Sequence, residues 1–484
     1  MSGSARARTS ASIAASMELI IQNLGRIEHA ELEIRPLTVF VGKNSTNKTW
    51  TAYALHGLLQ YMTWRRPGIR SVRSMGTSLI KIQTEEVREQ VISAAKRAID
   101  RSPREGADAS VEIEVSRREL LDGIEQPTEF LFDSEHLSNL LGVKHGEISP
   151  DARAMLRVPA DELRKRDATL SMQLSYAERS VRLLWTAGEP ELSLSVQLSS
   201  TVSVEALRER AEKLLRAFAQ RFLSMGMVLV LPAERKALAS TYKQPQDNGA
   251  FDEVLSRPVV AFVNFLKSTE AQWEASKGTA MPSALEYLDK RILRGSVEFH
   301  GAGDKNRLMF VPRNGPPLPM HASSSMVRSL AGLDLYLRHG ARKGDTLIID
   351  EPEMNAHPEA QLGLVELLAY LVNEGIRVVL TTHSPYIVDH INNLIWARKL
   401  SEADQDEVAK KLALGTRECL LRGEDVAAYL FEAEGEEGPV RVEPIFQQDD
   451  PEHLIDWDTF SRTSHYLSNL YAAEILPRLY RGEE

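Results

Sequence analysis

The chain contains almost no cysteine: Cys419 is the only one among 484 residues. A single thiol cannot form an intrachain disulfide, and it cannot supply a four-cysteine zinc site. Long apolar runs are also lacking, because no stretch approaches the roughly 20 residues that span a bilayer. These absences favour a cytoplasmic protein without a membrane partner.

The chain also lacks an excess of positive charge. It has 58 Lys and Arg against 68 Asp and Glu, a formal net charge of −10. Tight non-specific DNA binding usually needs a basic face, so the charge balance does not indicate DNA as a partner, although a local basic face stays open. The densest basic cluster, residues 64–73, is interpreted as solvated surface.

A phosphate-loop pattern lies near the start of the chain. The segment "GKNSTNKTW" follows the apolar run "LTVFV" and precedes a stretch with helical spacing, "KTWTAYALHGLLQYM". It fits G-x-x-x-x-G-K-[ST] except that Asn47 replaces the second glycine. Asparagine is the residue other than glycine that best tolerates the left-handed region, so we expect a working loop. Its candidate nucleotide contacts are Gly42, Lys43, Asn44, Ser45, Thr46, Asn47, Lys48, Thr49 and Trp50.

The chemistry of this pattern assigns separate roles to its last residues. Backbone amides and the positive end of the following helix attract phosphate. Lys48 is predicted to reach the β and γ phosphates, and Thr49 to ligate Mg²⁺.

Acidic residues end a buried strand far downstream. Asp350 is the last residue of the run "TLIID", and Glu351 follows it. At this end of a buried strand, an α/β sheet holds Mg²⁺ opposite the phosphate loop. We expect Asp350 to bind the metal with Thr49, and Glu351 to deprotonate the attacking water. A capping carboxylate pair before Pro352 is the alternative interpretation.

A histidine follows the next apolar strand. His383 comes after "RVVLTT", and the helical run "EAQLGLVELLAYLVNEG" separates this strand from "TLIID". Strand, helix and strand in this order predict a parallel pair. His383 is then expected to bond the γ-phosphate or the attacking water, and an ordinary structural histidine is the alternative.

Together these motifs resemble the ABC-type ATPase family, in its non-transporter branch with the SMC, RecF and OLD proteins. "GKNSTNKT" resembles the Walker A motif, "LIIDEPEMNAHP" the Walker B motif and D-loop, and "TTHSPYIV" the switch histidine. "LPAER", residues 231–235, is similar to a turn common in the OLD-like subgroup. The resemblance implies an α/β fold: an ABC-type P-loop ATPase head, with a mixed sheet, helices on both faces, an antiparallel β lobe and a mixed helical/β insertion. It also implies ATP and Mg²⁺ as cofactors.

The same family uses a Ser-Gly signature loop, which one subunit gives to the ATP of another. In "HASSSMVRSLAG", Ser324 and Ser325 stand at the serine positions, but Met326 stands where glycine is expected. The resemblance implies a homo-oligomer built from ATP-sandwich dimers, in which both serines contact nucleotide. An ordinary helix N-cap is the alternative for this serine cluster.

The resemblance also suggests how the chain is divided. We expect residues 1–16 to be a disordered extension, 17–64 and 296–400 to form the ATPase core, and 65–225 to be a mixed α/β insertion. Residues 226–295 are expected to hold a strand, the "PAER" turn and a helical lobe, and residues 401–484 a short extension without a nuclease domain.

The function implied by the resemblance is that of the ATPase subunit in anti-phage defence systems such as PARIS or Septu. Such a chain would hydrolyse ATP as a sensor or switch for a separate effector, a nuclease or toxin encoded nearby, in response to a phage-derived trigger. Two alternatives stay open. One is a DNA repair or chromosome-maintenance ATPase that binds DNA directly, and the other is a weakly hydrolysing, nucleotide-gated scaffold.

Overall fold

A computed structural model describes the chain in two compact units. One comprises residues 1–17, 61–130 and 157–225, and the other residues 18–60, 131–156 and 226–484. The described residues are 16–63, 109–116, 128–144, 146–159, 169–177, 180–186, 192–197, 226–242, 255–273, 281–301, 306–435, 437–446 and 455. The predicted N-terminal extension, apart from Ser16 at its end, and the basic cluster 64–73 lie outside them.

The first unit contains an antiparallel sheet. Its strands are β4 (Ala109–Ser116), β7 (Thr169–Ala177), β8 (Ser180–Thr186) and β9 (Leu192–Gln197), in the order β4-β7-β8-β9. Strands β7, β8 and β9 pair with their sequence neighbours, and β4 pairs with β7. All four strands lie within residues 65–225, the segment predicted to be a mixed α/β insertion.

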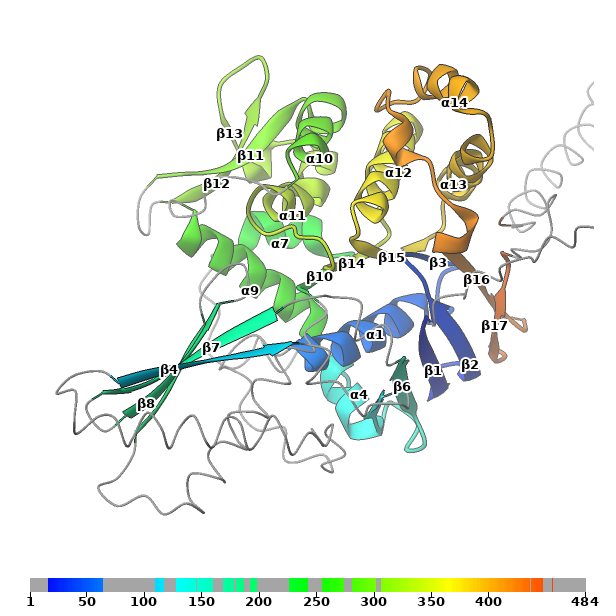
Figure 1. Cartoon of the computed structure of the whole chain (residues 1–484). Coiled ribbons are helices and arrows are strands. Elements are labelled where there is room, and N and C mark those ends of the chain that lie inside the picture. The colour runs from blue at the N-terminus through cyan, green and yellow to red at the C-terminus, as the bar shows by residue number, and fades with distance from the viewer. Residues whose placement is uncertain are drawn as a thin grey trace, which may run out of the picture. The chain divides into compact units, whose positions relative to one another are not determined.

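The second unit is built on a six-stranded sheet with the order β10-β14-β15-β3-β16-β17 (Figure 1). Neighbouring strands are parallel except for β17, which runs antiparallel to β16. Continuous apolar runs form β3, β10, β14 and β15 because both faces of the sheet are buried there, whereas the edge strand β17 is largely exposed. The bounds are β10 (Val228–Leu231), β14 (Thr346–Asp350), β15 (Arg377–Thr382), β3 (Leu37–Gly42), β16 (Val426–Ala433) and β17 (Val440–Pro444).

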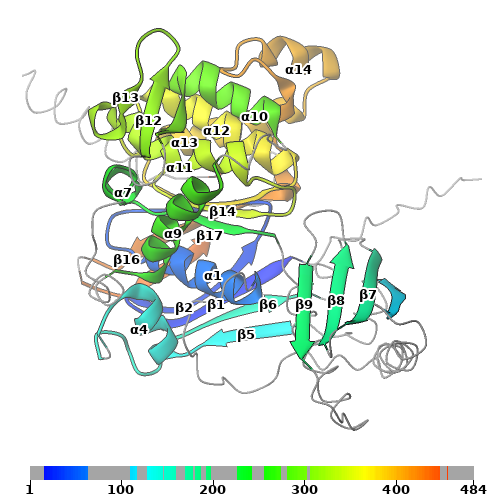
Figure 2. The ribbon, with the colours of Figure 1, turned by 90° about the vertical axis from the view of Figure 1, so that its left-hand side faces the viewer.

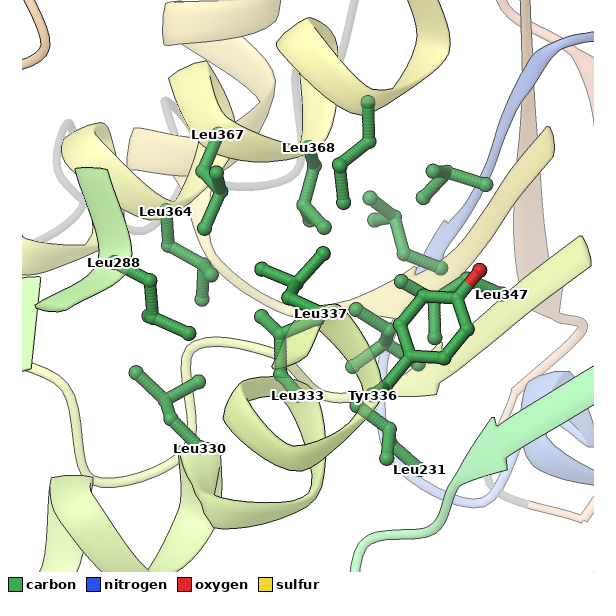
Figure 3. Packing of buried hydrophobic residues seen from close by; sticks show 14 of the residues in the cluster. Leu231, Leu288, Leu330, Leu333, Tyr336, Leu337, Leu347, Leu364, Leu367 and Leu368 are labelled. Atoms are coloured by element: carbon green, nitrogen blue, oxygen red, sulfur yellow. The ribbon is translucent and has the colours of Figure 1, made fainter. Parts of the chain in front are cut away.

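Helices cover both faces of this sheet. Helix α1 (Lys48–Thr63) lies on one face, and α11 (Ser325–His339), α12 (Pro358–Asn373) and α13 (Pro385–Arg398) lie on the other (Figures 1 and 2). Leucines from α11 and α12 interdigitate with Leu231 and Leu347 of the strands (Figure 3). The opposite side of β3 presents Phe40, whose ring packs against Tyr429 and Phe431. The predicted mixed sheet with helices on both faces is therefore confirmed.

Smaller elements surround this core. Strands β2 (Ile27–Ile34), β1 (Met17–Leu24), β6 (Arg153–Val158) and β5 (Thr128–Phe132) form a second sheet in that order, and β11 (Gly295–His300), β12 (Arg307–Pro312) and β13 (Leu318–Pro319) form an antiparallel one. The remaining helices are α4 (Ser134–Leu141), α7 (Arg235–Thr241), α9 (Arg257–Gln272), α10 (Pro282–Tyr287), the π-helix η1 (Leu288–Leu293) and α14 (Glu402–Ala409). Among the described residues, single 3-10 turns are η3 (Met320–Ala322), η4 (Arg417–Cys419) and η5 (Gly423–Asp425). Within the described part of the chain, no helix combines the length and apolarity that crossing a membrane requires.

Residues 426–444, within the predicted C-terminal extension, form a hairpin that joins the central sheet. Strand β16 pairs in parallel with β3, so that Phe431 lies opposite Gly42 at the start of the phosphate loop. Residues 426–444 thus complete the sheet that carries the loop. The domain boundaries proposed from the sequence remain predictions.

Candidate nucleotide-binding site

The loop between β3 and α1 uses three residues with positive φ. The angles are 151° at Gly42, 61° at Ser45 and 62° at Asn47. At Gly42 a side chain is excluded twice, because a Cβ there would lie 2.2 Å from the carbonyl oxygen of Phe431 and the φ angle favours glycine. At position 47 the backbone adopts the left-handed conformation that asparagine tolerates.

Asn47 also braces the loop through its side chain. Its Oδ1 accepts a hydrogen bond of 3.0 Å from the amide of Arg26, in the turn between β1 and β2. Gly25 of that turn lies so close that a Cβ on it would be 2.2 Å from Asn47 Nδ2. A glycine at position 47 would give the same backbone freedom but no such bond.

The Lys48 ammonium lies inside the loop. It donates to the carbonyl oxygens of Gly42 at 3.0 Å and Lys43 at 2.6 Å, and to Thr46 Oγ1 at 3.3 Å. Burial lowers the pKa of Lys48 to about 8, although the carboxylates of Glu351, Asp350 and Glu353 act in the opposite direction. All three acceptors are neutral oxygen atoms. An anionic phosphate would form a stronger, charge-assisted hydrogen bond with this buried ammonium.

Residues 301 positions apart meet next to the loop. Thr49 Oγ1 donates to Asp350 Oδ1 at 3.0 Å and lies 3.2 Å from Oδ2. Thr381 Oγ1, at the end of β15, donates to Asp350 Oδ1 at 2.5 Å. Burial raises the pKa of Asp350, and the hydrogen bonds from Thr381 and Thr49 oppose that rise.

Glu351 and His383 form a pair at the same edge of the sheet. His383 Nε2 lies 3.2 Å from Glu351 Oε1. The hydrogen bond from His383 lowers the pKa of Glu351, which keeps the carboxylate ionised. Glu351 itself has a φ of 49°, and its amide donates to the carbonyl oxygen of Thr381 at 3.2 Å.

The other predicted loop residues have simpler positions. Lys43, Asn44 and Ser45 form an exposed rim, Thr46 is buried and Trp50 is half-buried. Thr46 Oγ1 donates to the carbonyl oxygen of Lys43 at 2.8 Å, which closes the turn. The loop as a whole lies between the end of β3 and the first turn of α1, as the sequence predicted.

Ser324 and Ser325, the predicted signature serines, form local hydrogen bonds. Ser324 is the N-cap of α11, and its Oγ accepts from the amide of Val327 at 3.3 Å. Ser325 Oγ accepts from Arg328 at 3.4 Å. Among the described residues, no hydrogen bond joins either serine to the phosphate loop of its own chain. Their contact with the nucleotide of another copy remains a prediction.

Sequence reasoning missed two buried groups at this site. Glu353 Oε1 accepts from Thr382 Oγ1 at 2.8 Å and from the amide of His383 at 2.7 Å. Its other oxygen is buried and has no partner among the described residues, and burial raises the pKa of Glu353. Arg235 was noted only as part of a motif, yet its guanidinium donates to the carbonyl oxygens of both Asp350 and Glu351. Two features of the sequence could have indicated these residues. Glu353 is a further acid in "DEPE", residues 350–353, and Arg235 is a cation shortly after an apolar strand.

The oxygen ligands present fit Mg²⁺ bound together with a nucleotide. In the described ranges no group of three or more His, Cys, Asp or Glu side chains is arranged to hold a metal alone. Mg²⁺ commonly takes one or two carboxylates, several waters and substrate phosphates. Asp350 and Thr49 would supply the protein ligands for that arrangement.

Residues 248–388 match a family model described as an AAA ATPase domain. This stretch is similar to that family over less than half of the chain. It includes Ser324, Ser325, Asp350, Glu351 and His383, but it does not extend to the phosphate loop. No curated protein matches the chain.

Solved structures similar to the chain include three SMC head domains. One is an Smc head bound to the C-winged helix domain of ScpA, with 9% identity over 90% of this chain and 99% of that chain and a TM-score of 0.33. Another, from Pyrococcus furiosus, is an Smc head domain with an extended coiled coil bound to the C-terminal domain of ScpA; identity is 9%, coverage 94% and 98%, and TM-score 0.32. The third is the SMC head domain from Thermotoga maritima, at 8% identity, 88% and 98% coverage and a TM-score of 0.30.

Proposed function

We propose that this chain is an ATP hydrolase whose Mg²⁺-ATP binds against the loop 42–50 and the acids that follow β14. The observation that carries the proposal is the hydrogen bond of 3.0 Å between Thr49 Oγ1 and Asp350 Oδ1, beside the Glu351–His383 pair. The loop 42–50, the Asp350 carboxylate and the Glu351 carboxylate, whose pKa is lowered, lie together there. The AAA ATPase match over residues 248–388 supports this reading.

Each side chain has a distinct task in this proposal. Lys48 holds the phosphates through its ammonium, and Thr49 and Asp350 hold the metal. When bound, Mg²⁺ neutralises charge that develops on the phosphate oxygens. Glu351 accepts the proton of the attacking water.

His383 regulates that base. The hydrogen bond from His383 lowers the pKa of Glu351, and a carboxylate with a low pKa is a weak proton acceptor. General bases work best with a pKa near the operating pH. We therefore propose that His383 leaves Glu351 to bond the γ-phosphate, which makes Glu351 a stronger base only when nucleotide is present.

The complete site is proposed to form between two copies of the chain. ATP bound to one copy would be covered by Ser324 and Ser325 at the start of α11 of a second copy. The exposed rim of Lys43, Asn44 and Ser45 leaves the loop open on the side where another molecule would approach. The resulting homo-oligomer would assemble on ATP and relax after hydrolysis.

The proposed role in the cell is that of a cytoplasmic switch in bacterial anti-phage defence, which controls a separate nuclease or toxin. The support is the motif set, which resembles the compact ATPases of such systems. The test is to express the chain with the products of its neighbouring genes and to challenge the cells with phage. Protection that requires Lys48 and Glu351 supports the proposal, and equal protection by the Lys48→Ala variant overturns it. Salt-dependent DNA binding by the lone chain would instead favour the chromosome-maintenance alternative.

Hydrolysis itself is tested with Glu351→Gln and with Glu359→Gln as a matched control. Glu359 is an exposed glutamate in the first turn of α12, so it undergoes the same chemical change, and among the described residues no hydrogen bond or ion pair joins its carboxylate to the loop or to Glu351. Removal of a general base typically costs about 10²- to 10⁴-fold in rate. We expect that loss in ATP turnover for Glu351→Gln, with nucleotide binding retained, and no loss for Glu359→Gln. Equal inertness of wild type and Glu351→Gln would contradict the enzyme assignment and favour the scaffold.

A further inference from the structure

Arg235 is a buried cation that bonds only to backbone. It is 1% exposed, and its guanidinium reaches four carbonyl oxygens. Nε donates to Ser329 at 3.0 Å, Nη1 to Pro232 at 3.0 Å and to Asp350 at 2.5 Å, and Nη2 to Glu351 at 2.7 Å. Among the described residues, no salt bridge joins Arg235 to a carboxylate. Burying a charge without a direct ion partner costs desolvation free energy. We therefore considered what the four bonds of Arg235 hold in place.

The peptide that Arg235 contacts has an unusual conformation. Glu351 has a φ of 49°, a left-handed value that is strained for a glutamate and that persists only where surroundings hold it. Its amide donates to Thr381 on one side, and its carbonyl oxygen accepts from Arg235 on the other. The position of the Glu351 carboxylate therefore depends on both bonds.

The same guanidinium contacts α11. Ser329, which accepts from Arg235 Nε, lies one turn after the start of that helix at Ser325. A second bond to Ser329 comes from the segment after β14, where Asn355 Nδ2 donates to Ser329 Oγ at 3.4 Å. Helix α11 and the segment after β14 are thus joined at Ser329 through both its backbone and its side chain.

We propose that Arg235 is a positioning residue that holds Glu351 in its left-handed conformation and couples that conformation to the position of α11. The catalytic part of this inference rests on the proposed function, because it takes Glu351 as the base. In that setting Ser324 and Ser325 at the start of α11 meet the nucleotide of one site, while Glu351 serves the other. A shift of α11 would move Ser329, and the rigid planar guanidinium of Arg235 would transmit that movement to Glu351. Lysine cannot replace it fully, since one ammonium cannot reach four carbonyl oxygens in a fixed plane.

The coupling is tested first without nucleotide, by hydrogen exchange measured with mass spectrometry. In Arg235→Met we expect at least about tenfold faster exchange over residues 350–356, where the amides of Glu351 and Met354 are hydrogen-bonded. The control is Arg338→Met on α11, the helix that Arg235 contacts, and this variant loses bonds to Asp289 and Asp334 instead. That control should leave exchange over 350–356 unchanged. Unchanged exchange in Arg235→Met would overturn the proposal.

The second test compares ATP turnover with nucleotide binding. Misplacing a catalytic group by about 1 Å can cost 10²-fold in rate, so we expect Arg235→Met to lower kcat by that amount and to change nucleotide Kd less than threefold. Arg235→Lys keeps the charge and should recover part of kcat, and it replaces the methionine variant if that one does not fold. Unchanged kcat in both variants overturns the proposal. Lack of turnover in wild type would reject the ATPase assignment alone, because the exchange experiment still decides the coupling.

Discussion

At the residue scale, Asn47 combines two properties in a single side chain. Its backbone has the left-handed φ of 62° that the loop requires, and its Oδ1 accepts from the amide of Arg26. The family pattern has glycine here, which supplies the first property but not the second. The substitution therefore exchanges backbone freedom for a contact with the β1–β2 turn.

Replacing Asn47 by alanine should cost more than replacing it by glycine. The glycine variant loses a hydrogen bond, about 1 kcal/mol of unfolding free energy. The alanine variant loses that bond and also adopts a left-handed conformation, which adds on the order of 1 kcal/mol or more. Urea unfolding measures the order, and titration with a fluorescent ATP analogue should place nucleotide affinity in the same order. An alanine variant as stable as the glycine variant would contradict this account.

At the element scale, the parallel strands β14 and β15 bring two polar segments together. The carboxyl ends of neighbouring parallel strands share one edge of the sheet, and the residues that follow pair across it. Thr381 bonds to Asp350, Thr382 to Glu353, and Ser384 Oγ to Gln361 at 2.6 Å. This series of bonds fixes His383 relative to Glu351, because both residues lie within bonded segments.

Helix α11 provides a prediction at the same scale, because Ser324 is both its N-cap and a proposed nucleotide contact. Ser324→Ala should lose about 1 kcal/mol of cap energy, which speeds hydrogen exchange in the first turn roughly fivefold. Ser324→Asp restores the cap, since aspartate is as good an N-cap as serine.

ATP turnover separates the two roles of Ser324. A carboxylate facing the γ-phosphate is repelled, so Ser324→Asp should recover the protection of α11 but not the turnover. Full recovery of both in Ser324→Asp would leave capping as the only role of this serine.

At the scale of the whole molecule, buried polar pairs connect the elements behind the site. His390 Nε2 of α13 lies 2.9 Å from Glu366 Oε1 of α12, and Glu366 also accepts from the amides of Ala413 and Leu414. The segment after α14 is thereby attached to the two helices. The buried charge of Lys48, by contrast, lowers the stability of the folded chain, because burial disfavours its ammonium.

Lys48 therefore gives the nucleotide-free protein a particular pH dependence. Its pKa is about 8 in the folded chain and about 10.5 when exposed, so between these values the unfolded state binds more protons. Stability should accordingly rise with pH across this window, by on the order of 3 kcal/mol relative to Lys48→Met, since one pKa unit is about 1.4 kcal/mol. Nucleotide affinity should fall over the same range, because the phosphates require the ammonium.

Urea unfolding and nucleotide titration between pH 7 and pH 10 measure both trends, each taken as the difference from Lys48→Met. The variant removes the titrating group and leaves the other lysines in place. Stability and affinity that change in the same direction with pH would show that the charge of Lys48 is not buried in the free loop.

The sequence by itself determined the local parts of this protein. Apolar runs bounded by turn residues predicted β3, β14 and β15, and helical spacing predicted α1 and α12, because these signals depend on near neighbours in the chain. The phosphate-loop pattern identified Lys48 and Thr49, and strand ends identified Asp350, Glu351 and His383. Parallel pairing through a crossover helix then predicted that these residues share one sheet edge, and the structure places them there.

The tertiary structure alone decided the contacts between distant segments. Strand β16 pairs with β3 across almost 390 residues, a choice of partner that no local pattern specifies. Arg235 lies 115 positions from Asp350, and its role depends on four carbonyl oxygens, which every residue carries and which no sequence pattern can distinguish. The sequence specifies the chemistry of each side chain. Backbone carbonyl groups are the same in every residue, so only the folded structure determines which of them accepts from a particular donor.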